Sequence, residues 1–471
     1  MKEPALYEKV ANEITNLIKK GTFRPGERIP SVRQLHKQLQ VSISTVMEAY
    51  RLLEDHGMIE CRPQSGYYVI SLPASTSLEI DASKPSPKPT KVSVNELIMM
   101  ILKDGRNPDL IQLGAAIPNP ELLPVERINR ALSVVTRRYR IRNILYEFSP
   151  GCEELRVQIA RRALTSGCTI TPDDIIITSG CQEAIMLALM VICKPGDTVA
   201  IESPTYYNFL QAIEILGLRA IEIPAHPRDG INIDTLRYAI EHNPIKACLF
   251  ITSFSNPLGS CMPDDKKKDL VEMLSEYDIP LIEDDIYGDI SFSYQRPKTA
   301  KAFDRKEIVL LCSSFSKTIA PGYRVGWMVP GKFKNEIERL KSVSNIATAT
   351  PIQLAIADFL ADGGYDHHLR KIRRIYARNV ALMSEAVNMY FPEGTRVSRP
   401  SGGHVLWVEL PKHIDSLELY EKALKKGISF APGPIFSSRQ KYRNFLRLNA
   451  ASWNEDIKAA VKTLGSLAGK K

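Results

Sequence analysis

The sequence reads SSFSK at residues 313–317 and PGYRVGW at residues 321–327, directly after an apolar run from Ile308 to Cys312. A short apolar run of this kind is typical of a buried strand, so Lys317 lies just past the end of one. Most lysines are solvated surface charges. In this setting, desolvation and nearby cations would lower the pKa of the lysine amine and make it nucleophilic. Lys317 is therefore the candidate catalytic residue.

Further apolar strand runs alternate with helical stretches through the C-terminal part of the chain. They lie at residues 175–177, 198–201, 247–251, 280–282 and 308–312. This alternation predicts an α/β fold, in which helices cover a mainly parallel sheet.

Two other segments place polar groups at the ends of such runs. TSGCQE at residues 178–183 leads from a strand through a small turn into a helix, whose free backbone N–H groups can bind an anion. LIEDDIY at residues 281–287 places Asp284 and Asp285 directly after an apolar strand. Because a strand leads straight into these acids, we interpret them as part of a site and not as a solvated loop.

Together with other motifs between residues 95 and 465, these segments resemble the class I aminotransferases, which are fold-type I enzymes of pyridoxal 5'-phosphate (PLP). The resemblance implies that Lys317 holds the cofactor aldehyde as a Schiff base. It implies that Asp284 pairs with the pyridine nitrogen and keeps the ring an electron sink, with Asp285 as the competing candidate. The residues that it places on the cofactor phosphate are Cys181, Gln182, Ser314, Arg324 and Tyr146, the last supplied to the neighbouring subunit of a homodimer with shared PLP sites.

The resemblance also assigns residues around the cofactor ring. Tyr287 and Asn256 would lie near the ring hydroxyl. Tyr206 would stack on the flat face of the ring, although Tyr207 beside it leaves the register open.

Two residues are assigned to the substrate, an amino acid or another small amino compound. Arg447, in FLRLN at residues 445–449, would bind the α-carboxylate. Gly114, in LGAA at residues 113–116, would approach the same carboxylate through its backbone.

A segment from Pro73 to Lys91 divides the chain, because it concentrates Pro, Ser, Thr and Lys and lacks aromatic residues. Such a composition is typical of an exposed, semi-stiff linker. We therefore expect an N-terminal domain at residues 1–72, a flexible linker at 73–92 and the aminotransferase-like PLP domain at 93–471. Its small-domain part would cover roughly residues 335–471 together with an N-terminal segment.

The N-terminal domain shows helical patterns followed by a hairpin pattern. Apolar residues recur at helical spacing from Leu6, a second helix begins after Ser31, and a third begins after Ser42 and ends at Gly57. Strand-like runs on both sides of a turn at residues 63–66 then predict a wing. The pattern, with the motifs PGERIPSVR (25–33), VSISTV (41–46) and YRLLE (50–54), resembles the GntR family of winged helix-turn-helix regulators.

The GntR resemblance implies contacts to a double-stranded DNA operator. The residues that it assigns to DNA binding are Arg33, Ser42, Ser44, Thr45, Arg62, Ser65 and Gly66. Ser42, Ser44 and Thr45 would offer donors at a helix N-terminus in the major groove, and the wing residues would lie near the minor groove. Ile43 and Met47 stand where relatives often carry basic residues, which predicts fewer phosphate contacts and a shallower salt dependence. Alternatively, Ile43 packs on a thymine methyl.

Taken as a whole, the chain resembles the MocR/GabR regulators. The first hypothesis is a transcription regulator in which PLP on Lys317, with or without an amino compound at Arg447, shifts the domain arrangement and so the DNA affinity. The second is an aminotransferase that acts on an amino acid and a 2-oxo acid, with DNA binding secondary. The third is a sensor of PLP with no amino ligand.

Composition and apolar runs also bear on whether the protein binds a metal, a membrane or a nucleic acid. The eight cysteines include no Cys-x-x-Cys pair, so we expect no metal site. The longest apolar run, Ala184 to Cys193, is far shorter than the roughly 20 residues of a membrane span. No signal-peptide core opens the sequence, so we expect a cytoplasmic protein with no membrane partner. The net charge of +9 is compatible with a nucleic-acid partner but does not identify one.

Overall fold

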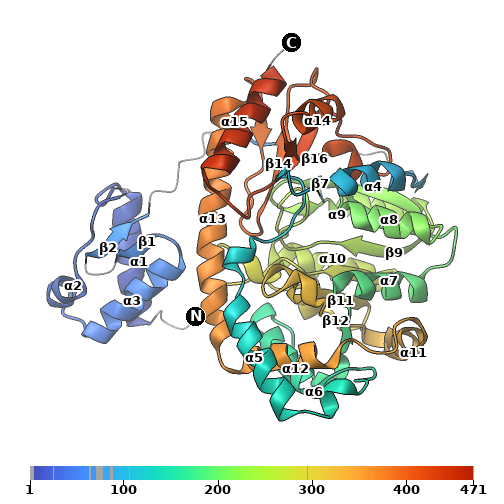
Figure 1. Ribbon diagram of the computed structural model, residues 1–471, viewed down its shortest axis with the longest axis horizontal. Helices are drawn as coiled ribbons and strands as arrows, with labels where there is room; N and C mark the ends of the chain where they lie inside the picture. Colours follow the sequence, from blue (N-terminus) through green and yellow to red (C-terminus); the bar gives the residue numbers. More distant parts are fainter. Residues whose placement is uncertain are drawn as a thin grey trace.

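The computed structural model has two parts, which we call the head (the described residues of 5–70) and the body (the described residues of 78–469). Figure 1 shows the head beside the long helix α13 of the body. The residues that the structure describes are 5–24, 26–62, 65–70, 78–84, 88–104, 107–293 and 295–469.

The head is a small helical unit closed by a β-hairpin. Its core is built by apolar residues from each element, including Ile14, Val46, Leu53 and Val69. Ser31 and Ser42 cap the second and third helices through hydrogen bonds from Gln34 N and Thr45 N. This arrangement confirms the predicted winged helix-turn-helix. Its elements are α1 (Leu6–Lys19), α2 (Val32–Leu39), α3 (Ile43–Asp55), β1 (Ile59–Arg62) and β2 (Gly66–Val69).

A large sheet forms the centre of the body. The neighbouring strands from β7 to β11 run parallel, and the pairs at both ends of the sheet are antiparallel. The mainly parallel α/β sheet predicted from the sequence is confirmed. In spatial order the strands are β3 (Thr90–Lys91), β7 (Arg219–His226), β6 (Thr198–Ser203), β9 (Ile245–Phe250), β10 (Leu281–Asp284), β11 (Val309–Ser314), β12 (Gly326–Val329) and β5 (Ile176–Thr178), with β8 (Gly230–Ile231) paired to β7.

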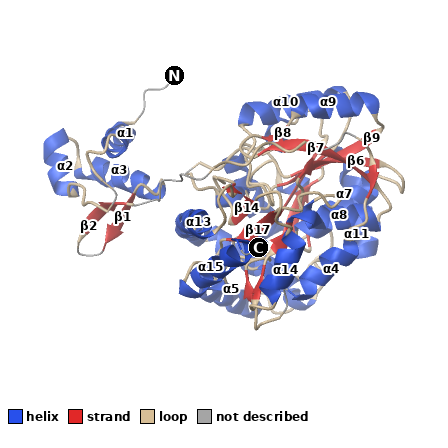
Figure 2. Cartoon of the chain, turned by 90° about the horizontal axis from the view of Figure 1, so that it is seen from above, coloured by secondary structure: helices blue, strands red, loops and turns tan. Residues whose placement is uncertain are grey.

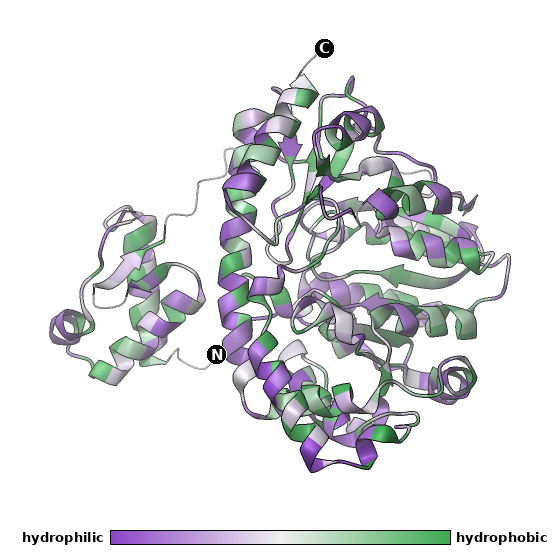
Figure 3. Ribbon diagram, in the orientation of Figure 1, coloured by the Kyte–Doolittle hydropathy of each residue, from purple (hydrophilic) through white to green (hydrophobic). Residues whose placement is uncertain are grey.

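Helices cover both faces of this sheet. In Figure 2, α9 and α10 lie on one side of the strands and α7, α8 and α11 on the other. The strands themselves are almost wholly buried and appear mostly apolar in Figure 3, as a sheet covered on two faces requires. The helices around the sheet are α4 (Asn95–Asp104), α5 (Val125–Arg138), α6 (Glu153–Ala163), α7 (Cys181–Ile192), α8 (Tyr207–Ile215), α9 (Ile233–His242), α10 (Asp264–Glu276), α11 (Lys334–Ser344) and α12 (Thr350–Ala361).

A smaller α+β unit completes the body. Its antiparallel strands are β13 (Arg396–Val397), β14 (Val405–Glu409), β17 (Phe445–Asn449) and β16 (Ala431–Pro432), in that order. The strand β15 (Ile428–Ser429) pairs in parallel with β4 (Ile111–Gln112), so an early segment of the body joins this unit. Its helices are α13 (Gly364–Tyr390), α14 (Ser416–Leu424) and α15 (Glu455–Gly469).

The described residues of the predicted linker at 73–92 contact the body. Ile80 is buried against the body, Ser83 Oγ accepts a hydrogen bond from Ala225 N at 2.9 Å, and Glu79 forms an ion pair with Arg228 at 2.5 Å. The proline-rich composition conceals buried apolar residues such as Ile80 and a short strand, β3, at the sheet edge. Residues 73–77 and 85–87 lie outside the described part of the chain.

Candidate functional site

Lys317 lies one turn beyond the end of β11, in the short helix η7 (Phe315–Lys317). Its Nζ donates a hydrogen bond to the Ala116 carbonyl oxygen at 2.6 Å and lies 5.5 Å from the centroid of the Tyr287 ring. Burial and the nearby charge of Arg447 lower the pKa of Lys317 to about 8, while Asp284 acts in the opposite direction. About a tenth of the amine is therefore neutral, and nucleophilic, at pH 7.

The two candidate acids at the end of β10 differ in what they bind. Asp284 is 3% exposed, and its Oδ1 accepts hydrogen bonds from Ile286 N at 3.0 Å and from the Cys181 thiol at 3.4 Å. Burial raises the pKa of Asp284 to about 7, against the effect of these hydrogen bonds and of Lys317. Asp285 Oδ2 instead forms an ion pair with Arg296, and Asp285 Oδ1 is buried without a hydrogen-bond partner among the described residues. This difference favours Asp284 as the acid that faces a ligand.

The N-terminus of α7 lies beside the predicted anion-binding residues. A side chain on Gly180, which has a positive φ of 88°, would overlap the Arg324 guanidinium. Arg324 donates hydrogen bonds to Ser179 O at 3.2 Å and to Ser316 Oγ at 3.3 Å, and Ser314 Oγ accepts one from Ser316 N at 3.3 Å. The segments at 178–183, 313–317 and 321–327 therefore converge on one place. Cys181 and Gln182 form the first turn of α7 there.

Arg447 on β17 is completely buried. Its Nη1 donates to Asn256 Oδ1 at 2.8 Å, and its Nη2 donates to the Gly114 carbonyl oxygen. A side chain on Gly114 would overlap the backbone of Phe430, so the close approach at this glycine is to Phe430. The Arg447 Nε, also buried, has no hydrogen-bond partner among the described residues. This nitrogen is available to a ligand.

Three tyrosines lie around these groups. Tyr287 is 2% exposed, and its hydroxyl has no hydrogen-bond partner in the part of the chain that the structure describes. The rings of Tyr206 and Tyr207 lie 4.8 Å apart, and the Arg447 guanidinium lies 5.8 Å from the centre of the Tyr207 ring. Burial raises the pKa of Tyr206, and Tyr207, Tyr287 and Asp284 add to the rise. Both tyrosines are therefore close to the site, and the register stays open.

Tyr146 lies on the surface of a single chain. Its side chain is 70% exposed, and its ring contacts Phe148 at 5.7 Å between centroids. Ile141, Ile144 and Leu145, just before it, are also exposed apolar residues. We call the segment at 141–148, with its exposed Ile141, Ile144, Leu145, Tyr146 and Phe148, the apolar segment.

A buried network connects the surroundings of Lys317 to α13. The Tyr365 hydroxyl is 2.8 Å from Thr318 Oγ1 and 2.9 Å from Asp289 Oδ2, and His368 Nε2 contacts the Thr318 carbonyl oxygen at 2.6 Å. Arg373 Nε donates to the Asp289 carbonyl oxygen at 2.7 Å. The residue next to Lys317 is thus held by the first turns of α13.

The same network reaches the acids at the end of β10. Arg296 bridges Asp285 and Asp289, with Nη1 at 2.8 Å from Asp289 Oδ1. Arg296 and other neighbouring arginines lower the pKa of Asp289 to about 2 against the effect of burial. Asp289 therefore stays ionised and holds the arginines in place.

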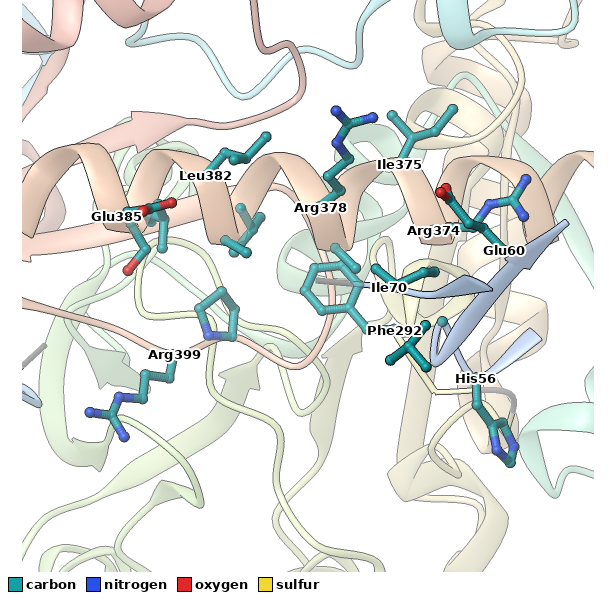
Figure 4. A pocket seen from close by; sticks show the side chains of 18 of the residues that line it. His56, Glu60, Ile70, Phe292, Arg374, Ile375, Arg378, Leu382, Glu385 and Arg399 are labelled. Atoms are coloured by element: carbon teal, nitrogen blue, oxygen red, sulfur yellow. The ribbon is translucent and has the colours of Figure 1, made fainter. Parts of the chain in front are cut away.

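α13 also contacts the head. Arg374 Nη1 lies 3.2 Å from Glu54 Oε1, and the same Glu54 oxygen accepts a hydrogen bond from Cys61 N at 3.1 Å. Beside this ion pair, a cavity of about 1310 Å³ separates the head from the body. Figure 4 shows its lining, which includes His56 and Ile70 of the head and Arg378 of α13. The head is therefore joined to α13 by an ion pair at the edge of an incompletely filled interface.

The residues predicted to bind DNA lie at two places on the head. Ser42, Ser44 and Thr45 form a hydroxyl cluster at the start of α3, with Oγ–Oγ distances of 2.7 Å from Ser42 to each of the others. Ile43 and Met47 are exposed on the same helix, 46% and 56% respectively.

The other predicted DNA contacts lie on α2 and the wing. Arg33 is exposed on α2. Arg62 pairs with Glu60 at 2.7 Å, and Ser65 Oγ lies 2.7 Å from the Tyr68 hydroxyl. Gly66 has a φ of 110° and packs against Arg28. Arg62 also lines the cavity next to the body, so this wing residue is shared between two surfaces.

Sequence reasoning missed several residues of the site. Ser316 lies within the SSFSK motif at residues 313–317 and could have been found from it. Arg296 and Tyr365 come from segments without a recognisable pattern. His404, which is completely buried near Lys317, is another residue that sequence reasoning missed.

Among the described residues, no group of three or more His, Cys, Asp or Glu side chains could hold a metal ion. In the same part of the chain, no helix combines the length and the apolar character needed to cross a membrane.

Two family models match the chain. Residues 140–464 match "Aminotransferase class I and II", and residues 6–69 match "Bacterial regulatory proteins, gntR family". The two matches fall on the body and on the head.

Named relatives are similar to this chain over different shares of its length. An uncharacterized HTH-type transcriptional regulator of Escherichia coli (strain K12), YdcR, is 39% identical over 98% of both chains. Aromatic-amino-acid aminotransferase 1 of Thermococcus litoralis is 32% identical over 78% of this chain and 90% of its own length. Among solved structures, the kynurenine aminotransferase of Pyrococcus horikoshii superposes with a TM-score of 0.73 at 33% identity, covering 80% of this chain and 93% of that one. The full-length resemblance is to a regulator, and the aminotransferases resemble the body.

Proposed function

The chain belongs to the MocR/GabR-type regulators, which join a gntR-family head to an aminotransferase class I domain, and we propose that it is a bacterial transcription regulator whose binding to operator DNA responds to PLP and an amino compound in the body. DNA binding is assigned to the N-terminus of α3 and the wing. Since the proposed partner is chromosomal DNA, the proposal also places the protein in the cytoplasm.

The buried polar groups of the body fit PLP. The Tyr287 hydroxyl and the Arg447 Nε are buried without partners among the described residues, and a buried polar group is normally hydrogen-bonded. Lys317 would hold the cofactor aldehyde, Asp284 would hold a proton at the pyridine nitrogen, and the first turn of α7 with Ser314 and Arg324 would bind the phosphate. When bound, PLP supplies an electron sink for a substrate carbanion.

The amino compound would bind at Arg447. The guanidinium carries a full charge in a buried place, and Asn256 and Gly114 hold its two terminal nitrogens. A carboxylate that meets the Nε edge would make a charge-assisted hydrogen bond shielded from water. Lys317 could then accept or return a proton at the α-carbon of such a ligand, because its pKa is about 8.

The observation that carries the regulatory proposal is that α13 contacts both the segment of Lys317 and the head. Near its N-terminus it binds Thr318, the residue after Lys317, and at Arg374 it pairs with Glu54 of α3. A ligand changes an equilibrium only by binding two states with different affinity. Here the two states would differ in the position of α13 against the head.

We propose that the protein is a homodimer with shared sites. The apolar segment exposes Ile144 by 82% and Tyr146 by 70%, and contiguous exposed apolar residues mark interaction sites. Docked on a second copy, this segment would carry Tyr146 to the partner's phosphate site.

The test measures cofactor binding and DNA binding on the same preparations. The wild type should show the visible absorbance band of bound PLP, and Lys317→Ala should lose it, whereas Lys103→Ala, at an exposed lysine of α4, should keep it. Affinity for DNA selected from a random library is then measured with and without PLP and a panel of amino acids. A DNA affinity that never changes with PLP or any amino acid would contradict the regulatory proposal.

The second candidate function is an aminotransferase of amino acids and 2-oxo acids. It is favoured by the presence of Lys317, Asp284 and Arg447 in one site and by the resemblance of the body to named aminotransferases. Steady turnover of amino acid and 2-oxo acid, together with a DNA affinity that ignores both, would support this candidate. A response of DNA affinity to PLP alone would instead identify a PLP sensor.

A further inference from the structure

His404 lies directly before β14 in the smaller unit of the body, and its side chain is completely buried. Its ring centroid is 5.5 Å from that of Tyr287 and 5.2 Å from that of Tyr376. Lys317 Nζ lies 5.5 Å from the centroid of the same Tyr287 ring. His404 and the candidate catalytic amine are therefore two neighbours of one tyrosine.

The hydrogen bonds of Asn449 determine which nitrogen of His404 carries the proton. Asn449 Nδ2 donates to the Ile117 carbonyl oxygen at 2.9 Å, and Asn449 Oδ1 accepts from Ala451 N at 3.0 Å, so the orientation of this amide is fixed from both sides. His404 Nδ1 lies 2.9 Å from the same Oδ1. Since Oδ1 can only accept, Nδ1 must donate its hydrogen.

The ring is neutral near pH 7. Burial, with the charges of Lys317 and Arg447, lowers the pKa of His404 to about 3, although Asn449 acts in the opposite direction. A neutral imidazole that is protonated on Nδ1 has a lone pair on Nε2. His404 therefore presents a hydrogen-bond acceptor.

That acceptor has no partner in the described part of the chain. Nε2 is buried and makes no hydrogen bond there. Leaving a buried acceptor unpaired costs free energy, which is why such groups in folded proteins are nearly always satisfied by protein, water or ligand. Two other unpartnered groups near it, on Tyr287 and Arg447, are already assigned to PLP and to the ligand carboxylate. A third, the Tyr376 hydroxyl, is also buried without a partner among the described residues, on a ring that contacts that of His404.

We infer that His404 Nε2 accepts a hydrogen bond from a donor group on the side chain of the amino compound, and so selects amino acids that carry such a donor over apolar amino acids of the same shape. This inference rests on the proposed function, because it concerns the ligand of the same site. Donors of this kind are a hydroxyl, a phenol, an amide N–H or an indole N–H. His404 is then a specificity-determining residue, since a site built around an acceptor rejects a ligand that leaves it unpaired.

The experiment compares amino acids that differ only by one donor. The PLP-loaded full-length protein is titrated with L-tyrosine against L-phenylalanine and with L-serine against L-alanine, and dissociation constants are read from the change in cofactor absorbance and from calorimetry. At least one donor-bearing member should bind about tenfold more tightly than its partner, as expected for one buried hydrogen bond. In His404→Phe this ratio should fall to about one, whereas His404→Gln, which retains an acceptor, should keep part of it. His413→Phe, at an exposed histidine, should leave the ratio unchanged.

The outcomes separate the inference from the proposed function. Loss of any response to every amino acid, or absence of bound PLP in the wild type, would contradict the proposed function and the inference with it. Equal binding within every pair by the wild type would overturn the inference alone and assign Nε2 to a buried water. A ratio that persists in His404→Phe would overturn it as well. If His404→Phe does not bind PLP, His404→Leu is tested in its place. The wild-type ratios still decide whether the site prefers amino acids that carry a donor.

Discussion

Arg374 of α13 and Glu54 of α3 form an ion pair between the body and the head, with 3.2 Å between Nη1 and Oε1. Both side chains are partly exposed, 44% and 27%. Ion pairs in such positions contribute about 0–1 kcal/mol to stability. The pair is therefore weak enough to be made and broken as the head changes position.

The first prediction is that Glu54→Gln changes the response to ligand more than it changes stability. The substitution removes the charge that faces Arg374, and the free energy of unfolding should change by less than about 1 kcal/mol. The ratio of DNA dissociation constants with and without PLP, measured by fluorescence anisotropy, should shift several-fold. Glu48→Gln, at another acid exposed on α3, serves as the control. An unchanged ratio in Glu54→Gln would exclude this ion pair from the coupling.

The second prediction concerns the pH dependence of PLP capture by the cofactor-free protein. Only the neutral Lys317 amine is nucleophilic, and burial with Arg447 lowers the pKa of Lys317 to about 8. The rate of capture should therefore rise about tenfold between pH 7 and pH 9 and then level off. The rate is followed in a stopped-flow spectrophotometer and corrected with the reaction of PLP and a free lysine derivative. A rate that still climbs steeply above pH 9.5 would show an unperturbed lysine.

The third prediction is that Arg447→Lys separates amino acid binding from cofactor binding. Lysine keeps the charge but lacks the planar fork that meets a carboxylate and holds Asn256 and Gly114. Dissociation constants of amino acids should rise by about tenfold or more, which corresponds to the loss of roughly 1.5–3 kcal/mol for a hydrogen bond to a charged group. The absorbance band of bound PLP should remain. Unchanged amino acid affinity would place the carboxylate elsewhere.

The fourth prediction concerns the oligomeric state. Ile144→Lys puts a charge into the exposed apolar segment, and burying that charge between two copies would be costly. Sedimentation velocity should show a dimer for the wild type and a shift toward monomer for this variant. Ile215→Lys, at an isoleucine of α8 that is 70% exposed, should remain dimeric. If both variants sediment as the wild type does, the apolar segment is not the interface.

The fifth prediction tests the DNA surface of the head. Arg33→Ala should weaken DNA binding and, if the arginine contacts a phosphate, lower the slope of the salt dependence by about 1. If it contacts a base instead, the slope should stay and sequence preference should relax. Lys103→Ala on the body is the control for general charge effects. Affinity and slope that both stay at wild-type values would remove Arg33 from the interface.

The sequence was informative wherever a polar residue directly follows an apolar strand. Lys317 follows β11, Asp284 ends β10 and Cys181 follows β5, all in one sheet. The apolar runs located these residues at strand ends, and the resemblance to the class I aminotransferases assigned them to one site. Ser42 was found for a similar reason, because a capping residue before a helical pattern has a recognisable signature.

Residues that act through contacts between distant segments could not be predicted in this way. Arg296 lies in a polar stretch with no periodicity, and only the fold brings it onto Asp285 and Asp289. The role of His404 depends on the amide orientation of Asn449, which local sequence does not specify. The anchoring of Ile80 was hidden because Leu78 and Ile80 are too few apolar residues to form a pattern in a proline-rich stretch.

The anchoring of the segment at residues 78–84 sets a limit on how far the head can travel. Ile70, the last described residue of the head, and Leu78, which bridges to Arg396 of the body, are eight positions apart in the chain. Eight residues span at most about 28 Å when fully extended. In an assembly of two copies, the distance between the two half-sites on a promoter would therefore be bounded by the separation of the two Leu78 anchor points, plus twice that reach and the size of the two heads.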